Sequence, residues 1–302
     1  MKLDNKIALI TGASRGIGAG IARELAANGA RVILAARTLH PDPQETWGDG
    51  GPPIPGSLSE TVAEIRAAGG EAEAYPIDLS NTAEIEKMIA HIDARHGRID
   101  ILVNSAMGFP QSYKGEIWNT ADRDWHAFMD IGVRAKYLTT HFASKIMIRE
   151  KQGLIANISA GASKIEYYNP VFRMAMSAID RMTAAVADDL RPHNVHAVSI
   201  WPRWVRTERV LMAAENDRLG FDVTSGDLEQ SDSPEFTGRA IVHLAIDPEL
   251  ASRSGQTFPL LKLAHDYGFT DLDGSVAELD EFSRDWADRL ARISRILQEE
   301  SG

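Results

Sequence analysis

Short apolar runs alternate along this chain with segments whose apolar residues recur at helical spacing. The apolar runs have the length of buried strands and span residues 7–10, 31–36, 72–77, 99–103, 154–159, 195–200 and 257–261. The helical segments span residues 19–28, 59–68, 83–96, 121–148 and 170–190. Strands that alternate with helices predict a parallel sheet of about seven strands with helices on both faces. The chain shows no internal repeat and no linker, so we expect residues 1–270 to form one doubly wound α/β domain.

The stretch 38–57 breaks this alternation. It carries five prolines and four glycines, a composition that excludes a regular helix or strand. We therefore expect an inserted loop after the second strand. Three roles are open for it: it closes over a bound ligand, it packs on a neighbouring subunit, or it is a tolerated surface insertion.

A glycine-rich turn joins the first strand to the first helix. Its sequence is Gly12-Ala13-Ser14-Arg15-Gly16-Ile17-Gly18, and the second strand follows soon after the helix. Glycine lets the backbone approach a pyrophosphate, and the start of the helix offers N–H groups and a partial positive charge to that anion. Strand, turn, helix and strand in this order predict a Rossmann-like dinucleotide site.

Composition narrows the classes of partner. The formal net charge of −11 argues against a nucleic-acid surface, which needs concentrated lysine and arginine. The chain has no cysteine, which excludes disulfides and thiolate ligands, and we expect no metal site. The chain contains no run of about 18 apolar residues, the length needed to span a membrane, so we expect no membrane-spanning segment. Residues 1–6 lead straight into the first strand without a signal peptide, so we expect a cytoplasmic protein.

The glycine turn resembles the cofactor loop of the short-chain dehydrogenase/reductase (SDR) family, and further motifs extend the resemblance over residues 5–265. These motifs are Asp78-Leu79, Asn104-Ser105-Ala106, Asn157-Ile158-Ser159, Ser177–Thr183, Trp201–Glu208 and Ser254–Thr257. The loop insertion and the Trp-Pro turn resemble the hydroxysteroid-dehydrogenase-like subgroup. The resemblance implies a nicotinamide-dependent oxidoreductase. The cofactor contacts it implies come from Gly12, Ser14, Arg15, Gly16, Ile17, Gly18, Arg37, Asp78, Leu79, Asn104, Ala106, Pro202, Val205 and Thr207.

The end of the second strand bears on the choice of dinucleotide. Family members that prefer NAD usually carry an acidic residue where Ala36 stands, and this position is neutral here. Arg37 follows it and Arg15 lies in the glycine turn, so two guanidinium groups are available to a 2′-phosphate. We therefore prefer NADP(H) to NAD(H) as the cofactor. The alternative is that Arg37 is an ordinary solvated residue at a strand end.

The family's reaction uses a tyrosine as proton donor, a lysine four residues later, a serine and an asparagine. Residues four apart share one face of a helix. Matching the motifs places Phe172 at the tyrosine position, Met176 at the lysine position and Gly132 at the asparagine position. Ser159 stands at the serine position, with Ala160 as the alternative register. No tyrosine in the chain is followed by a lysine four residues later.

The resemblance therefore implies a site whose proton donor is altered. We take Ser159 and Tyr168 as the candidate catalytic residues, because Tyr168 precedes the helix that carries Phe172. Other candidate substitutes are Lys136, Lys164, Glu166, Tyr167 and Arg173.

Three functions are consistent with these residues. One is a divergent NADP(H)-linked oxidoreductase acting on a carbonyl, an alcohol or a conjugated alkene. A second is a catalytically silent relative that serves as a binding or assembly subunit. A third is a lyase or isomerase without net redox chemistry.

Residues 203–238 occupy the place of the family's substrate lid. Their apolar side chains favour a bulky hydrophobic substrate. Beyond them, residues 271–302 predict a C-terminal helical extension with an apolar stripe over 276–297. Homo-oligomerisation as a dimer or tetramer, usual in the family, would bury that stripe.

Overall fold

The computed structural model describes residues 1–44, 46, 51–108, 110, 113–161, 168–215 and 228–279. These residues contain a seven-stranded sheet in the order β3-β2-β1-β4-β5-β6-β7, and every pairing is parallel. The strands are β1 Ile7–Thr11, β2 Arg31–Ala36, β3 Glu71–Pro76, β4 Ile101–Asn104, β5 Gly153–Ile158, β6 Val195–Trp201 and β7 Thr257–Pro259. The structure therefore confirms the predicted Rossmann-like doubly wound sheet.

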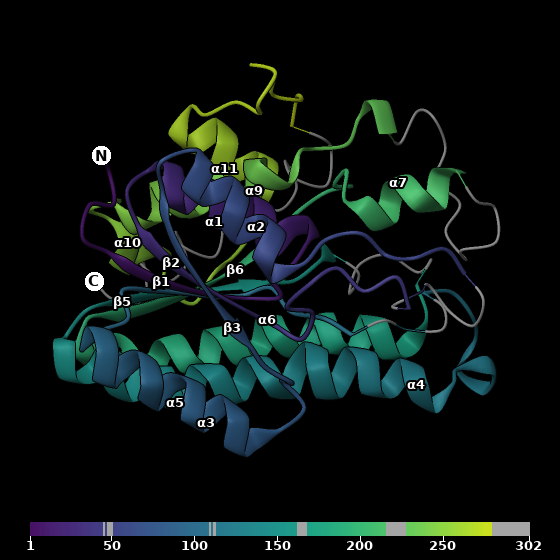
Figure 1. Cartoon of the computed structure of the whole chain (residues 1–302). Helices are drawn as coiled ribbons and strands as arrows, with labels where there is room; N and C mark the ends of the chain where they lie inside the picture. Colours follow the sequence, from purple (N-terminus) through teal and green to yellow (C-terminus); the bar gives the residue numbers. More distant parts are fainter. Residues whose placement is uncertain are drawn as a thin grey trace, which may run out of the picture.

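Helices cover both faces of this sheet (Figure 1). On one face lie α1 Gly16–Ala27, α2 Leu58–Ala67, α9 Pro234–Ala245 and α11 Leu260–Tyr267. On the other face lie α3 Thr82–His96, α5 Ala135–Glu150 and α6 Pro170–Leu190. Shorter helices are α4 Asp122–Trp125, α7 Glu208–Glu215 and α10 Leu250–Arg253. The central strands β1 and β4 are buried along their whole length because a parallel sheet is packed on both faces, whereas the edge strand β3 is largely half-buried or exposed.

Three predicted elements differ from the structure in detail. The predicted strand over 257–261 ends at Pro259, because Leu260 begins α11. The predicted helix over 121–148 is interrupted by a π-helical segment, His126–Arg134, which contains Gly132. Of the predicted C-terminal helix, residues 276–279 are not helical, and residues 280–302 lie outside the described part of the chain.

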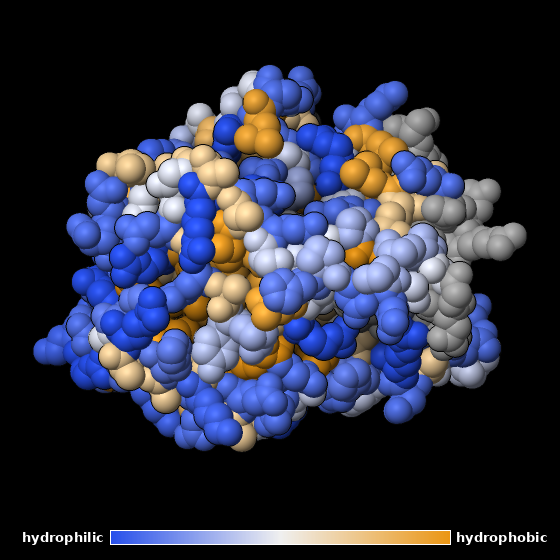
Figure 2. Space-filling view, in the orientation of Figure 1, coloured by the Kyte–Doolittle hydropathy of each residue, from blue (hydrophilic) through white to orange (hydrophobic). Residues whose placement is uncertain are grey.

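Hydrophilic side chains predominate on the face shown in Figure 2, and the apolar side chains on it form separate groups. Within the described ranges, no helix is long and apolar enough to cross a membrane.

A buried polar network joins the carboxyl ends of the central strands. The Asn104 side chain donates to Asn157 Oδ1 at 2.9 Å and to Thr140 Oγ1 at 3.0 Å. Asn157 in turn donates to Thr183 Oγ1 at 2.8 Å. These four side chains are buried, and each partner satisfies a group that would otherwise be costly to desolvate. Asn104, the last residue of β4, thus links that strand to β5 through its side chain.

Lys136 lies beneath the same strand end. Its side chain is 1% exposed, and its Nζ donates to the carbonyl oxygens of Asn104 at 2.8 Å and Ala106 at 2.9 Å. No carboxylate is among these partners, and burial lowers the pKa of Lys136 to about 7. The amino group therefore supports the turn after β4 through hydrogen bonds and carries only part of a charge at neutral pH.

This burial makes stability depend on pH. The unfolded chain keeps an ordinary lysine pKa near ~10.4, so between the two pKa values the unfolded state binds more protons and stability rises with pH. Relative to Lys136→Met, we expect the wild-type free energy of unfolding to rise by about 2 kcal/mol from about pH 7 to about pH 9. Urea denaturation at both pH values measures this difference. Lys87→Met, at an exposed position of α3, is the matched control and should leave the pH dependence unchanged. If the difference in free energy of unfolding between the wild type and Lys136→Met is the same at both pH values, burial does not lower the pKa of Lys136.

Candidate active site

A cleft of about 560 Å³ opens at the carboxyl ends of the strands. Ligands of open α/β sheets bind at this edge, at the point where the connections after two neighbouring strands leave toward opposite faces of the sheet. The connections after β1 and β4 do so here. Most of the predicted cofactor contacts line the cleft: Gly12, Ser14, Arg15, Gly16, Ile17, Gly18, Arg37, Asp78, Leu79, Ala106, Pro202 and Thr207.

Two of the predicted cofactor contacts, Asn104 and Val205, are not among the residues that line the cleft. Asn104 is buried in the strand-end network, and Val205 is buried and bridges to Asp232. Both support the wall of the cleft from behind.

The glycine turn is packed tightly against the residues that follow β4. Gly12 has a φ of +71°, and a Cβ on it would lie 2.7 Å from the Ala106 Cα. Gly16 has a φ of +56° and begins α1. L-residues with side chains rarely adopt such angles, and the contact with Ala106 leaves no room for one at Gly12. Glycine is therefore required here by backbone geometry as well as by any ligand.

A carboxylate lies on the first amide of α1. The Gly16 N–H donates to Glu208 Oε2 at 2.8 Å, and Glu208 is the first residue of α7. The start of a helix attracts anions, so this carboxylate takes a position where a phosphate would also be favoured. No sequence pattern predicts this contact, because the two residues are 192 positions apart.

The inserted loop 38–57 closes at its base and reaches the glycine turn. Leu58 N donates to Thr38 O at 3.0 Å, so the chain leaves and rejoins the domain at one place. The Arg15 guanidinium donates to the carbonyl oxygens of Pro55 at 2.9 Å and Gly56 at 2.7 Å. In this conformation Arg15 therefore links the loop to the turn. Residues 45 and 47–50 of the loop lie outside the described part.

The second arginine expected at this end of the cleft is exposed. Arg37 lies near Asp78, and its positive charge contributes to lowering the pKa of that carboxyl, after the stronger effect of a hydrogen bond from the Ser80 amide. Arg37 and an ionised Asp78 thus stand together where the adenosine half of a dinucleotide would be expected.

The other end of the cleft contains Ser159, Phe172 and Met176. Ser159 Oγ donates to the Met176 carbonyl oxygen at 3.3 Å and lies 3.7 Å from its sulfur. Gly132, in the π-helical segment, is not among the described residues that line the cleft. Neither is Tyr168, whose ring packs on Phe172 at 4.9 Å between centroids. The other candidate substitutes at 164, 166 and 167 lie outside the described residues.

A buried carboxyl lies behind Ser159. Asp180 accepts hydrogen bonds from Ser199 Oγ at 2.6 Å and from the Trp201 indole at 3.1 Å, and Ser159 is a further partner. Burial raises the pKa of Asp180 to about 6. The carboxyl orients the serine from below, and sequence reasoning did not single it out.

Tyr113 is a wall residue of the cleft that sequence reasoning also missed. Its ring centroid lies 5.3 Å from those of Phe128 and Phe172, and the latter two are 5.0 Å apart. Tyr113 and Phe172 give this end of the cleft an aromatic wall, and the fully buried Phe128 ring packs against both. In sequence, Tyr113 lies between the fourth strand and the following helix, in a segment without a recognisable pattern.

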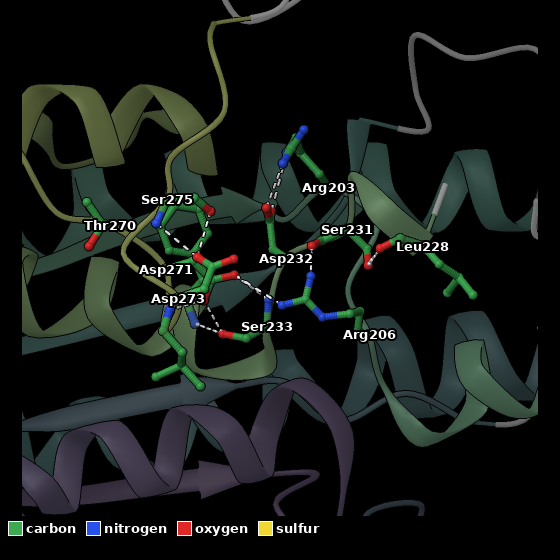
Figure 3. Close-up of polar contacts among 12 residues, drawn as sticks. Arg203, Arg206, Leu228, Ser231, Asp232, Ser233, Thr270, Asp271, Asp273 and Ser275 are labelled. Atoms are coloured by element: carbon green, nitrogen blue, oxygen red, sulfur yellow. Dashed lines mark hydrogen bonds and ion pairs between the residues drawn. The ribbon is translucent and has the colours of Figure 1, made fainter. Parts of the chain in front are cut away.

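A compact ionic cluster fastens residues 203–206, at the start of the predicted lid. Figure 3 shows Arg203 directed at Asp232 and Arg206 directed at Ser231, next to Asp271 and Ser233. Arg203 Nη2 lies 2.7 Å from Asp232 Oδ1, and Arg206 lies 3.5 Å from Asp271. The Ser233 amide donates to Asp271 Oδ2 at 2.7 Å. The cluster thereby ties residues 203–206 to the start of α9 and fixes where Thr207 and Glu208 meet the glycine turn.

Comparisons with known proteins agree with this architecture. Residues 54–260 match the family model described as enoyl-(acyl carrier protein) reductase, and residues 6–46 match the short chain dehydrogenase model. A mouse protein, dehydrogenase/reductase SDR family member 1, is 31% identical over an alignment covering 97% of this chain and 91% of that protein. A 3-oxoacyl-[acyl-carrier-protein] reductase of Synechocystis is 31% identical, covering 85% of this chain and 95% of that protein.

Among solved structures, a metagenomic short-chain oxidoreductase in complex with NADP is similar to this chain. It is 28% identical, with a TM-score of 0.63, and the match covers 83% of this chain and 94% of that one. The chain belongs to the short-chain dehydrogenase/reductase family of oxidoreductases, whose members bind a nicotinamide cofactor.

Proposed function

We propose that this chain is an NADP(H)-binding oxidoreductase that acts on a carbonyl, an alcohol or a conjugated alkene of a hydrophobic small molecule. One observation carries the proposal: a single cleft extends from the glycine turn to Ser159 and Phe172. A dinucleotide is an elongated ligand, and the wall of this cleft changes from arginines and backbone amides to aromatic and apolar side chains. Bound NADP(H) would exchange a hydride with the substrate at the apolar end.

The residues present fit the cofactor. The glycine turn brings backbone amides to the start of α1, where a pyrophosphate would bind. Asp78 and Leu79 would contact the adenine end, and Pro202 and Thr207 would contact the carboxamide of the nicotinamide. Ser159 would turn its hydroxyl proton from the Met176 carbonyl oxygen to the substrate oxygen, since it lies at the far end of the same cleft.

The preference for NADP(H) rests mainly on Arg37. Arg37 is exposed directly after β2, follows the neutral Ala36 and lines the cleft, so a 2′-phosphate bound at this end would meet its guanidinium. Arg15 is already bound to two loop carbonyls and would have to exchange those hydrogen bonds to take part. The NADP complex of the metagenomic relative supports this choice.

Replacement of Arg37 tests the preference. Loss of a charge-assisted hydrogen bond to phosphate costs about 1.5–3 kcal/mol, so we expect Arg37→Ser to weaken NADPH binding about tenfold or more and to change NADH binding little. Titration of the fluorescence of NADPH and NADH measures both affinities. Arg31→Ser, at the opposite end of the same strand, is the matched control. Failure of the wild-type chain to bind NADPH at millimolar concentration would overturn the proposed function.

A phosphate can accept a hydrogen bond from the Gly16 amide only if it displaces the Glu208 carboxylate. A carboxylate and a phosphate repel each other, and both favour the same helix start. Glu208→Gln keeps the shape of the side chain and removes its charge. We expect this variant to bind NADPH several-fold more tightly at low ionic strength, with the gain reduced by salt.

Glu215→Gln, at the other end of α7, is the control for this experiment, because it makes the same change of charge on the same helix. Calorimetric titration with NADPH at two salt concentrations measures the effect. Unchanged or weaker binding by Glu208→Gln would show that the contact with Gly16 does not compete with the cofactor.

A second candidate function is that of a catalytically silent binding or assembly subunit. Two observations favour it: Phe172 and Met176 place inert side chains at the reacting end, and Glu208 lies on the first amide of α1. Phenylalanine cannot give a proton, and methionine cannot stabilise a phenolate.

The double variant Phe172→Tyr, Met176→Lys separates the two candidates. In a silent chain it should create NADPH-dependent carbonyl reduction where the wild type shows none. In an enzyme with a displaced proton donor it should raise the rate little, because general acid catalysis is already present. The measurement is the loss of NADPH absorbance with an aromatic aldehyde. Met174→Lys, at an exposed position of the same helix α6 and outside the residues that line the cleft, is the control and should create no activity.

A further inference from the structure

A phenol and a guanidinium meet at the aromatic end of the cleft. Tyr113 and Arg209 both line the cleft, and the Arg209 guanidinium carbon lies 6.0 Å from the centre of the Tyr113 ring. A side-chain hydrogen bond joins the two residues. Tyr113 therefore has its hydroxyl beside a cation at the edge of the space where a substrate would react.

The backbone fixes Tyr113 next to Phe172. The Asn169 amide donates to the Tyr113 carbonyl oxygen at 2.7 Å, and the Asn169 side chain accepts from the Phe172 amide at 2.9 Å. Asn169 is fully buried and caps α6. One residue thus holds both the loop that carries Tyr113 and the first turn of α6. The edge-to-face contact of the Tyr113 and Phe172 rings, at 5.3 Å and 78°, follows from this anchoring.

Arg209 is suited to support a phenolate. Its guanidinium stays protonated at any ordinary pH, so it can stabilise a neighbouring negative charge but cannot itself donate the proton. Arg15 and Arg123 are close enough to influence its electrostatics and add to the positive field. Burial strengthens the interaction between charge and phenol, because the local dielectric is low.

We propose that Tyr113, held by Arg209, is the displaced proton donor of this enzyme. The inference rests on the proposed reductase function. A hydride from the reduced nicotinamide forms a C–H bond at the carbonyl carbon, and the C=O π electrons move to oxygen. That oxygen takes the proton of the Tyr113 hydroxyl, whose O–H bond breaks. The products are an alcohol, the oxidised dinucleotide and a Tyr113 phenolate, which Arg209 stabilises until solvent returns the proton.

The geometry favours Tyr113 over Tyr168. Both rings contact Phe172, at 5.3 Å and 4.9 Å between centroids, but only Tyr113 is among the described residues that line the cleft. A proton donor must reach the substrate oxygen directly or through one water. Tyr113 lines the cleft in which that oxygen would lie, and Tyr168 is not among the lining residues.

Tyr113→Phe is the decisive variant. It keeps the ring in the aromatic wall and removes only the hydroxyl, so the fold and the NADPH affinity should be preserved. We expect kcat for reduction of naphthaldehyde by NADPH to fall by about 10²–10⁴. Tyr137→Phe, on the exposed surface of α5, is the control and should retain full activity. Tyr168→Phe is the competing variant, and a loss there without a loss in Tyr113→Phe would overturn the proposal.

Two further measurements separate catalysis from structure. Arg209→Gln should lower kcat more than it weakens NADPH binding, and Arg209→Lys should recover part of the loss by restoring a cation. Addition of Phe172→Tyr and Met176→Lys to Tyr113→Phe should restore reduction, because a phenol and a cation then stand on α6 one helical turn apart.

The outcomes distinguish this inference from the proposed function. A wild-type chain that binds no NADPH defeats the function itself. A chain that binds NADPH and reduces no aldehyde, or one in which Tyr113→Phe keeps wild-type kcat, retains the cofactor site and defeats the assignment of Tyr113.

Discussion

The hydrogen bonds around the turn after β4 determine the shape of the cleft. Lys136 supports the carbonyl oxygens of Asn104 and Ala106 from below, and the Thr11 hydroxyl accepts from the Ala106 amide at 3.3 Å. The backbone at Ala106 is consequently held close enough to Gly12 that no Cβ fits between them. The position of the glycine turn, and with it the first amide of α1, depends on this segment. A nearly neutral lysine suits such a place, since a full charge there would have no carboxylate partner.

The cleft combines a positive interior with a negative protein. The chain has a net charge of −11, yet Arg15, Arg37, Arg123, Arg203 and Arg209 all line the cleft. A concentration of cations in a concave site raises the local concentration of anionic ligands. Glu208 on the Gly16 amide balances part of this charge at a helix start, where an anionic ligand would also be favoured.

The sequence was sufficient for features that depend on neighbouring residues. Alternating apolar runs predict the sheet and its helices, and the glycine turn predicts the cleft, because strand, turn and helix are adjacent in the chain. The boundary at Pro259 was missed, since an apolar run such as 257–261 continues from a strand into a buried helix without a change of pattern. The contact of Gly16 with Glu208 and that of Tyr113 with Phe172 could not be predicted from the sequence. Both depend on the tertiary packing of segments far apart in the chain.

The proposed placement of Phe172 at the family's tyrosine position is compatible with catalysis. A phenylalanine there would differ from tyrosine by one oxygen and keep the aromatic ring that packs beside the cleft. The reaction requires only that some acid reach the substrate oxygen, and an adjacent ring 5.3 Å away can present a hydroxyl to nearly the same space. A cation must then lie next to this hydroxyl, to stabilise the phenolate that forms when the proton leaves. Arg209 on α7 is such a cation, because its guanidinium carbon lies 6.0 Å from the centre of the Tyr113 ring.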